Sequence, residues 1–491
     1  MADGSNWRDA GTDDAYLAGM VDVFNQAAAM AGGYRRSLRE RWVTPTRSIV
    51  EVAADLGMQL PAGPTPPGEV INLLAEAADG GLMTTAGPRY FGFVIGGSLS
   101  AATAADMLAA GWDQNAFNSV SSPAAGAAEQ VAGSWLKDLL DLPASASTGF
   151  VTGAQAANTA GLAAARHRVL GDVGWDVEQR GLLGAPKVRV VASEERHATI
   201  DRSLRLLGLG NDCVTPVTAG ANGAIDTDHL AEVLAQVAVD GRGQASGQAP
   251  PIVCLQAGNV NTGACDDFRT AIDLVREHGG WVHVDGAFGL WAAASAQTRH
   301  LVDGVELADS WSCDGHKWLN VPYDSGFAFC AHPDIAATAM SYTAAYLTGS
   351  GTVSGMGDLT AESSRRARGF AAWAALRELG RDGIAELVDR CCLLARRFAS
   401  GLADGGAEIV NDVVLNQVLV GFTDTRAETK VAGPERIDSI AQAIQDDGTC
   451  WLGATTWRGR RLLRVSVSNH LTTIDDIDRS VAAVLRAAAR S

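Results

Sequence analysis

The sequence predicts an α/β protein with a largely parallel or mixed sheet, followed by a smaller α+β unit. Between residues 149 and 330, short apolar strand signals alternate with helical stretches, which is typical of an α/β domain. Beyond residue 360, a long amphipathic helix and a strand followed by a capped helix replace that pattern. We therefore expect a helical segment over 1–85, a large domain over 86–350 and a small domain over 351–491.

The expected elements follow one another in chain order. Helical patterns fill most of 1–85 up to a turn-rich break at 60–69, and alanine-rich helices are expected at 100–112 and 124–140. GFVTGAQAANTAGLAAARHRVL (149–170) predicts a strand end, a tight turn and a long helix. Four short strands are expected at 188–193, 252–257, 281–287 and 326–330. In the small domain we expect a helix over 363–380 ended by Gly380, an exposed loop at 424–436, and a strand and helix over 462–485.

Composition and charge narrow the classes of function. The chain has 491 residues, of which 47% are hydrophobic and 19% charged, as in a globular protein. Its formal net charge of −17 repels phosphate backbones and anionic lipids, so nucleic-acid and membrane partners are not expected. The start lacks a signal-peptide pattern, and no apolar run is long enough to span a membrane. Eight cysteines without CxxC spacing indicate reduced thiols, so we expect a cytoplasmic protein without disulfides or a metal site.

Two charged residues stand where strands end, and ligands of α/β sheets collect at the carboxyl ends of strands. Lys317 lies in an apolar stretch, ADSWSCDGHKWLNVPYDSG (308–326). A lysine at a strand end usually extends to solvent, but burial can turn its amine into a nucleophile. Asp285 ends the apolar run WVHVD. It can simply cap a turn, or it can hold a pyridinium nitrogen in its protonated form.

Two further features belong to the same pattern. TGAQAANTAG (152–161) opens a helix with small residues, and the free N–H groups there suit a phosphate, although such helix starts are common. His197 follows the strand VRVVAS, where it could be structural or could stack on a flat cofactor. A phosphate cradle, a stacking ring, a carboxylate and a lysine, in that order, favour pyridoxal 5'-phosphate as cofactor.

On these residues, the chain resembles the group II pyridoxal-phosphate-dependent amino-acid decarboxylases, which have the aspartate-aminotransferase-like (type I) fold. The likeness spans roughly residues 85–480 and is strongest in HVDGAFG (283–289) and in the lysine segment. It implies that Lys317 binds the cofactor covalently, that Asp285 pairs with the pyridine nitrogen, and that His197 and Ala287 lie on the two faces of the ring. It also implies a set of further cofactor contacts: Ala154 and Gln155 at the phosphate, and Asp314 and His316 close to the lysine.

The same resemblance assigns residues farther from the lysine. GPRYFGFVIGGS (87–98) resembles the family's substrate wall, so Phe91, Phe93 and Gly96 are expected at the substrate, with Gly96 and Gly97 leaving room. In a homodimer with shared active sites, Phe117 and Ser364 would reach the partner's site. Tyr346, in a loop after the lysine, would protonate the substrate's α-carbon once carbon dioxide has left.

The resulting expectation is an L-amino-acid α-decarboxylase that forms an amine and carbon dioxide from an aromatic or aliphatic substrate. Lys317, Asp285 and His197 are equally compatible with an aminotransferase or with a carbon–carbon lyase acting on β-hydroxy amino acids. A degenerate homologue that only binds is a third alternative, against which the intact Lys317 and Asp285 argue. Glutamate is disfavoured as substrate, because Arg89 is the one arginine in the wall segment.

Overall fold

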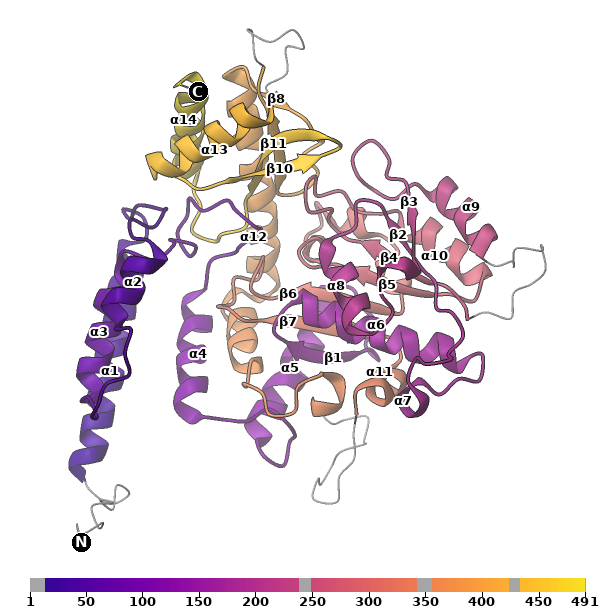
Figure 1. Ribbon diagram of the computed structural model, residues 1–491, viewed down its shortest axis with the longest axis horizontal. Helices are drawn as coiled ribbons and strands as arrows, with labels where there is room; N and C mark the ends of the chain where they lie inside the picture. The colour runs from indigo at the N-terminus through magenta and orange to yellow at the C-terminus, as the bar shows by residue number, and fades with distance from the viewer. Residues whose placement is uncertain (1–13, 238–248, 342–355, 424–432, 491) are drawn as a thin grey trace.

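A computed structural model describes residues 14–237, 249–341, 356–423 and 433–490. It contains a large sheet domain, a small sheet domain and an arm of N-terminal helices that extends away from the body (Figure 1). Within these residues, no helix has the length and apolarity needed to cross a membrane. The predicted domain boundaries at 85 and 350 stay a prediction.

The large sheet of the described chain has seven strands, in the order β1-β7-β6-β5-β4-β2-β3. Neighbouring strands from β3 to β6 are parallel, and β7 runs antiparallel to both β6 and β1. The carboxyl ends of β1 to β6 therefore meet at one edge. The bounds are β1 Ser147–Val151, β2 Val190–Ser193, β3 Val214–Val217, β4 Ile252–Gln256, β5 Trp281–Asp285, β6 Ser310–Asp314 and β7 Gly326–Cys330.

The four predicted strands and the strand–turn–helix at 149–170 are confirmed, but two strands of the large sheet were not predicted. β6 reads SWSCD, whose serines and aspartate obscure a strand that is buried throughout. β3 reads VTPV and lies at the edge of the sheet, where a proline is tolerated because its missing N–H faces no partner.

Helices cover the large sheet (Figure 1). α10 shows why they form: Asp267 caps its first turn, and its apolar residues recur at helical spacing on the buried face. The helices of this domain are α4 Ser100–Trp112, α5 Pro123–Leu139, α6 Ala154–Gly171, α7 Val177–Arg180, α8 Ala198–Leu206, α9 Thr227–Val237, α10 Phe268–Glu277 and α11 Pro333–Met340. Short 3-10 turns lie at Asn211–Cys213, Gly289–Ala294, Arg299–Val302, Val305–Leu307 and Met356–Leu359.

The small domain packs α12 (Gly369–Asp404), α13 (Pro434–Asp447) and α14 (Ile474–Arg490) against a sheet with strand order β10-β11-β9-β8. Its strands are β8 Glu408–Ile409, β9 Gln417–Gly421, β10 Gly453–Trp457 and β11 Arg460–Ser466. The predicted helix over 363–380 is wrong at its start, because the helix begins at Gly369. Its predicted end is confirmed, since Gly380 (φ 60°) has a non-helical backbone and a kink there separates the two helical stretches of α12. The expected loop at 424–436 is wrong from Pro434 on, where α13 begins, and 424–432 lie outside the described residues.

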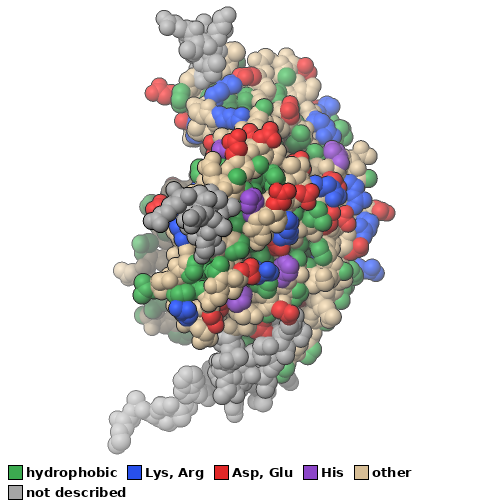
Figure 2. All heavy atoms as spheres, turned by 90° about the vertical axis from the view of Figure 1, so that its right-hand side faces the viewer, with side chains coloured by type: hydrophobic (Ala, Val, Ile, Leu, Met, Phe, Trp, Pro, Cys, Tyr) green, Lys and Arg blue, Asp and Glu red, His purple; other side chains and the backbone are tan. Residues whose placement is uncertain are grey.

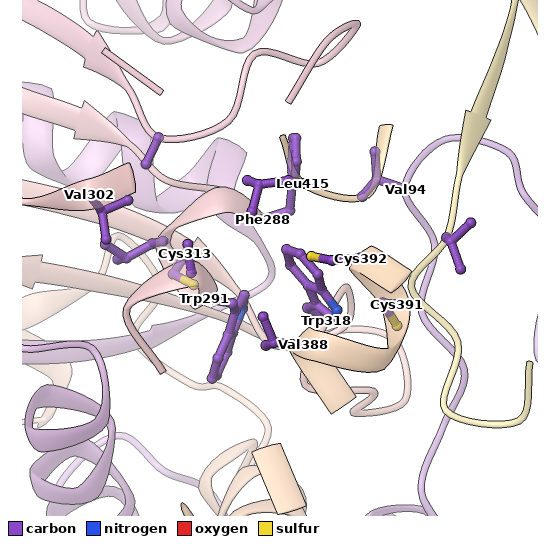
Figure 3. Close-up of a cluster of buried hydrophobic side chains, with 14 of the residues drawn as sticks. Val94, Phe288, Trp291, Val302, Cys313, Trp318, Val388, Cys391, Cys392 and Leu415 are labelled. Atoms are coloured by element: carbon purple, nitrogen blue, oxygen red, sulfur yellow. The ribbon is translucent and has the colours of Figure 1, made fainter. Parts of the chain in front are cut away.

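The segment around the candidate lysine is anchored in the core shared by the two domains. Trp318 and Trp291 are fully buried, and α12 contributes Val388, Cys391 and Cys392 to the same cluster (Figure 3). Lys317 therefore sits next to a fixed tryptophan, which limits where its side chain can reach. By contrast, the face in Figure 2 carries acidic and basic side chains interspersed with apolar ones.

Candidate active site

A cavity of about 230 Å³ lies at the carboxyl edge of the large sheet, facing the small domain. We call the part formed by His197, Asp285, Ala287 and Lys317 the cofactor half. We call the rest the substrate half. The substrate half is lined by Phe93, Val94, Gln256, Gly258, Val260, Asn261, Phe288, Thr455 and Arg464.

Asp285 is the last residue of β5, and its buried carboxylate is held from several sides. Asn158 Nδ2 donates to Oδ2 at 3.1 Å, Thr199 Oγ1 donates to Oδ2 at 3.4 Å, and the N–H of Ala287 donates to Oδ1 at 3.2 Å. Ser312 Oγ also lies 3.4 Å from Oδ1. These donors satisfy both carboxylate oxygens and hold the buried Asp285 side chain in one position.

A chain of buried polar groups fixes Asn158 in turn. Its Oδ1 lies 2.9 Å from Nε2 of His283, whose Nδ1 lies 2.8 Å from Oγ of Ser310. Burial lowers the pKa of His283 to about 4, with Asp285 acting in the opposite direction. His283 is therefore neutral near pH 7, donating through Nε2 to Asn158 and accepting at Nδ1 from Ser310. Sequence reasoning missed Asn158, although it lies in the same TGAQAAN segment that was singled out.

Lys317 lies in the turn after β6, and its Nζ contacts Oδ2 of Asp314 at 2.9 Å. The side chain is 19% exposed and borders the cavity, 6.0 Å from the centre of the Phe288 ring. Gly96 allows this arrangement, because a Cβ there would lie 1.8 Å from the backbone oxygen of Lys317. Gly96 therefore permits close backbone packing against the lysine, and the expectation that it leaves room for a substrate stays a prediction. Gly97 packs in the same way, against Asn469.

His197 caps the start of α8 and borders the cavity beside Asp285. Its Nδ1 lies 2.8 Å from Thr199 Oγ1 and accepts from the N–H of Thr199 at 3.3 Å, which favours the ring proton on Nε2. The ring keeps solvent-accessible surface, yet crowding by protein atoms lowers the pKa of His197, an effect that the Asp285 charge partly offsets. The neutral Nε2–H form is therefore the one to expect at physiological pH.

The substrate half receives two side chains from the small domain that sequence reasoning missed. Within the described residues, the side chain of Arg464 makes one hydrogen bond, from Nη1 to the Val260 oxygen at 3.2 Å, and burial lowers its pKa. Thr455 Oγ1 lies 3.0 Å from Asn261 Oδ1. A guanidinium with unused donors beside a cavity is suited to a carboxylate. Besides Lys317, Arg464 is the one cationic side chain that lines the cavity in the described chain.

Glu195 joins the two domains next to this cavity. Its Oε2 accepts from Trp457 Nε1 at 2.8 Å and from Asn259 Nδ2 at 3.2 Å, while Oε1 accepts from Arg458 Nε at 2.8 Å. Trp457 and Arg458 lie at the β10–β11 turn, and the two strands carry Thr455 and Arg464. The contacts of Glu195 therefore fix the position of β10 and β11, and with them Thr455 and Arg464, relative to the large domain.

The wall segment meets the cavity with a strained turn. Phe93 and Val94 both line it and both have positive φ values, 52° and 55°, which are costly for bulky residues. The Phe93 ring is 64% exposed. Phe91 does not reach the cavity; it is buried against Phe398, with the ring centres 5.2 Å apart.

Other predicted residues lie away from the cavity of their own chain. Phe117 packs near Gly357, and Ser364 is exposed beside Arg365, whose guanidinium forms a buried bidentate pair with Glu129 at 2.7 Å. Tyr346 lies outside the described residues. Arg89 is tied to Asp476 at 3.1 Å and to backbone oxygens, so it is not available to a substrate.

The predicted phosphate contacts lie beside the cavity rather than in its lining. The start of α6 has no side-chain cap, and Ala154 donates its N–H to Asp314 at 2.6 Å. The Gln155 side chain turns away to Ser203 on α8, at 2.8 Å. In the described chain, the backbone N–H groups of Gln155 and Ala156 have no acceptor, so this helix start keeps donors for an anion.

Comparison with known proteins identifies the family. A family model described as "Pyridoxal-dependent decarboxylase conserved domain" matches residues 58–423. The chain belongs to this family. This decarboxylase is 27% identical over 380 residues to the aromatic-L-amino-acid decarboxylase of Bacillus atrophaeus, covering 76% of this chain and 75% of the relative. It is 25% identical, also over 380 residues, to the phenylacetaldehyde synthase of Arabidopsis thaliana, covering 75% of each.

Its fold matches a solved structure of the same kind. The crystal structure of Oryza sativa TDC with PLP and tryptamine superimposes with a TM-score of 0.87 at 23% identity, covering 96% of this chain and 98% of that one. The predicted type I fold is thereby confirmed, and the decarboxylase is a carboxy-lyase that uses pyridoxal 5'-phosphate. The site fits that cofactor. Lys317 offers an amine, Asp285 a fixed carboxylate for a ring nitrogen, and the start of α6 unused N–H donors for a phosphate.

Proposed function

We propose that this decarboxylase acts on an aromatic or aliphatic L-amino acid and releases the corresponding amine and carbon dioxide. The observation that carries the proposal is the cavity, in which Phe93, Val94 and Phe288 face the reactive Lys317 and Asp285. Apolar walls favour loss of the carboxylate charge over its retention. They also suit an apolar side chain better than a charged one.

The residues of the cofactor half divide the work of catalysis. When bound, pyridoxal 5'-phosphate supplies an electron sink for the bond pair that carbon dioxide leaves behind. Asp285 would hold the proton on the ring nitrogen, because hydrogen bonds from Asn158 and from the Ala287 N–H already fix its carboxylate in place. Ala287 and His197 would flank the ring, and His197 can donate from Nε2 to a carboxylate or return a proton to carbon.

Arg464 supports a second candidate, an amino acid with an acidic side chain. A lone guanidinium at the substrate half can pair with the distal carboxylate of such a substrate, or with the α-carboxylate of any amino acid. The first pairing raises selectivity for acidic substrates, whereas the second slows decarboxylation by stabilising the charge that must be lost. The two pairings therefore predict different substrates.

In this proposal, Tyr346 of one subunit acts in the active site of the other subunit. It donates the proton that the α-carbon takes up after carbon dioxide leaves, so that the product is an amine and not an aldehyde. With Tyr346→Phe, we expect amine formation to fall at least about 100-fold, the usual contribution of a general acid, and an aldehyde to appear among the products. Amine formation at the wild-type rate in this variant would remove Tyr346 from the mechanism.

The working unit would be a homodimer in the cytoplasm. The arm formed by α1 (Asp14–Ser37), α2 (Ile49–Leu56) and α3 (Pro67–Asp79) extends from the body, and α2 has no buried residue (Figure 1). Ile49 and Leu60 are 85% and 96% exposed, which is costly unless a second copy covers them. All eight cysteines are free, and seven are buried, which suits a reducing compartment.

A screen for carbon dioxide release over the L-amino acids tests the substrate, with amine and aldehyde measured in parallel. Release from phenylalanine, tyrosine, tryptophan or leucine supports the proposal, and release from glutamate or aspartate alone supports the acidic candidate.

A subunit-mixing experiment tests the proposed dimer. Inactive Lys317→Ala and inactive Tyr346→Phe subunits are mixed. Random exchange restores activity in about a quarter of the sites if each site is shared. No recovery despite demonstrated exchange would contradict sharing.

A further inference from the structure

Asp314 ends β6 and is only 3% exposed, yet three donors already meet its carboxylate. The N–H of Ala154, the first residue of α6, donates to Oδ1 at 2.6 Å. Nε2 of His316 lies 3.2 Å from the same oxygen, and Nζ of Lys317 lies 2.9 Å from Oδ2. The carboxylate therefore joins the start of α6 to the lysine that receives the cofactor.

The side chains around Asp314 present it with one neutral donor and one cation. Nδ1 of His316 accepts from the N–H of Ser325 at 3.1 Å, so the ring proton is on Nε2 and points to Asp314. Burial lowers the pKa of His316, which keeps the imidazole neutral near pH 7. Lys317 is then the cation that balances Asp314, within the described residues.

Gly153 is the residue that lets the carboxylate approach the helix. A Cβ at this position would lie 2.9 Å from His316 Cε1 and 3.1 Å from Asp314 Oδ1. Asp314 thus occupies the place where the helix dipole and the first free N–H most favour an anion. A carboxylate at this point stabilises α6 in the protein that holds no cofactor.

Loading the cofactor works against this arrangement in two ways. A phosphate monoester at the start of α6 brings between one and two negative charges close to a buried carboxylate, and like charges in a low-dielectric site repel. In addition, the Lys317 amine that balances Asp314 is the group that would bond to the cofactor's aldehyde. Both effects raise the free energy of the loaded state relative to the empty one.

We propose that Asp314 is an internal anion that competes with the cofactor's phosphate and weakens cofactor retention, and is not a phosphate ligand. This role rests on the assignment of Lys317 and the start of α6 to pyridoxal 5'-phosphate. Weaker retention makes the fraction of the protein that carries the cofactor depend on the concentration of free pyridoxal 5'-phosphate. The proposed role differs from the expectation, implied by the family resemblance, that Asp314 is one of the cofactor contacts close to the lysine.

The test is the dissociation constant of pyridoxal 5'-phosphate, measured by titrating the visible absorption of the bound cofactor. Asp314→Asn keeps an oxygen for the Ala154 N–H and removes the charge. It should bind the cofactor about tenfold more tightly than wild type, a change worth about 1.4 kcal/mol. The matched control is Asp303→Asn, an exposed carboxylate paired with Arg269, which should leave the constant unchanged.

A cofactor analogue without the phosphate separates the proposed repulsion between Asp314 and the phosphate from the effect on the Lys317 pair. With pyridoxal in place of pyridoxal 5'-phosphate, the tightening in Asp314→Asn should be much smaller, because only the Lys317 pair is then disturbed. Without cofactor, the variant should melt at a lower temperature than wild type, since α6 loses its anion. With saturating cofactor, this gap should narrow or reverse.

Three results would overturn the role of Asp314: weaker binding of pyridoxal 5'-phosphate by Asp314→Asn, an unchanged constant, or equal tightening for pyridoxal. If Asp314→Asn does not fold, Asp314→Ser serves the same comparison, because its hydroxyl can still accept from Ala154. A wild-type absorption band that persists in Lys317→Ala would instead contradict the attachment site on which the proposal rests, so the two failures are distinguishable.

Discussion

Around Asp285, the polar side chains of the cofactor half are fixed by neighbours within the large domain, whereas Arg464 and Thr455 reach the same cavity from the small domain. Asp285 has four donors and Asn158 is held by a buried histidine. The side chain of Arg464 has a single backbone partner in the described chain. The cofactor half is thus complete before any ligand arrives, and the substrate half keeps donors for one.

This difference has a structural origin. The cofactor half is assembled from the ends of adjacent strands in one sheet, whose register is set by backbone hydrogen bonds. The substrate half depends on how β10 and β11 dock on the large domain through Glu195. Changes in the cofactor half should therefore act on cofactor binding and on the chemical step, and changes in the substrate half on KM.

The largest effect is expected for Lys317→Ala. Without the amine, the visible absorption of the bound cofactor should be lost, and decarboxylation should fall by at least about 1,000-fold, as for loss of a covalent catalyst. The measurement is an absorption spectrum together with carbon dioxide release. Lys187→Ala, a lysine outside the cavity lining, is the control and should behave as wild type.

Asp285→Asn should lower kcat by about 100- to 1,000-fold while the cofactor still binds. The amide fits the same space but cannot hold a proton on the ring nitrogen by charge. Asp267→Asn is the matched control, because Asp267 caps α10 and asparagine caps helices equally well. A kcat within about twofold of wild type for Asp285→Asn would contradict its role.

In the substrate half, Arg464→Gln should raise KM by about 10- to 100-fold, the loss expected for a hydrogen bond to a charged group. Arg461→Gln is the control from the same strand, since Arg461 pairs with Asp438 on the surface. Steady-state kinetics on the substrate found in the screen measure both. An unchanged KM in Arg464→Gln would show that the guanidinium does not meet the substrate.

Glu195→Gln tests whether the domain contact positions the substrate half. The amide loses the charge that pairs with Arg458, so we expect KM to rise by about 3- to 10-fold, with cofactor affinity retained. Glu195→Asp, which keeps the charge, should recover part of the loss. Glu408→Gln, at an exposed pair with Arg460, is the control. Loss of cofactor binding in Glu195→Gln would instead mean that the cofactor half also depends on this domain contact.

The smallest effect is on stability below neutral pH. Burial lowers the pKa of His470 to about 4 in the folded state, so between pH 6.5 and 4 the unfolded chain binds the extra proton. Folding stability from this group is complete above pH 6.5 and declines as the pH falls. In His470→Gln, the decline from pH 7 to 5 should be shallower by about 2 kcal/mol in urea titrations. An equal slope in both proteins would contradict the burial of a neutral His470.

Part of the site was predictable from the sequence, and part was not. Asp285, His197 and Lys317 were predicted because each lies at or just after the end of a strand, and strand ends of one sheet converge, whereas Ala287 was implied only by the family resemblance. Arg464 could not be chosen, because β11 carries three arginines and only the docking of two domains brings one to the cavity. The packing of Gly96 against Lys317 could not be predicted, since the sequence gives no sign of which backbone lies against the lysine.

The separation of the two halves is tested most directly by the dissociation constant of pyridoxal 5'-phosphate in Arg464→Gln. If the cofactor half is complete within the large domain, the constant should equal that of wild type within about twofold, even though KM rises. A tenfold weaker constant would contradict the account, because it would mean that the small-domain arginine helps to build the cofactor site.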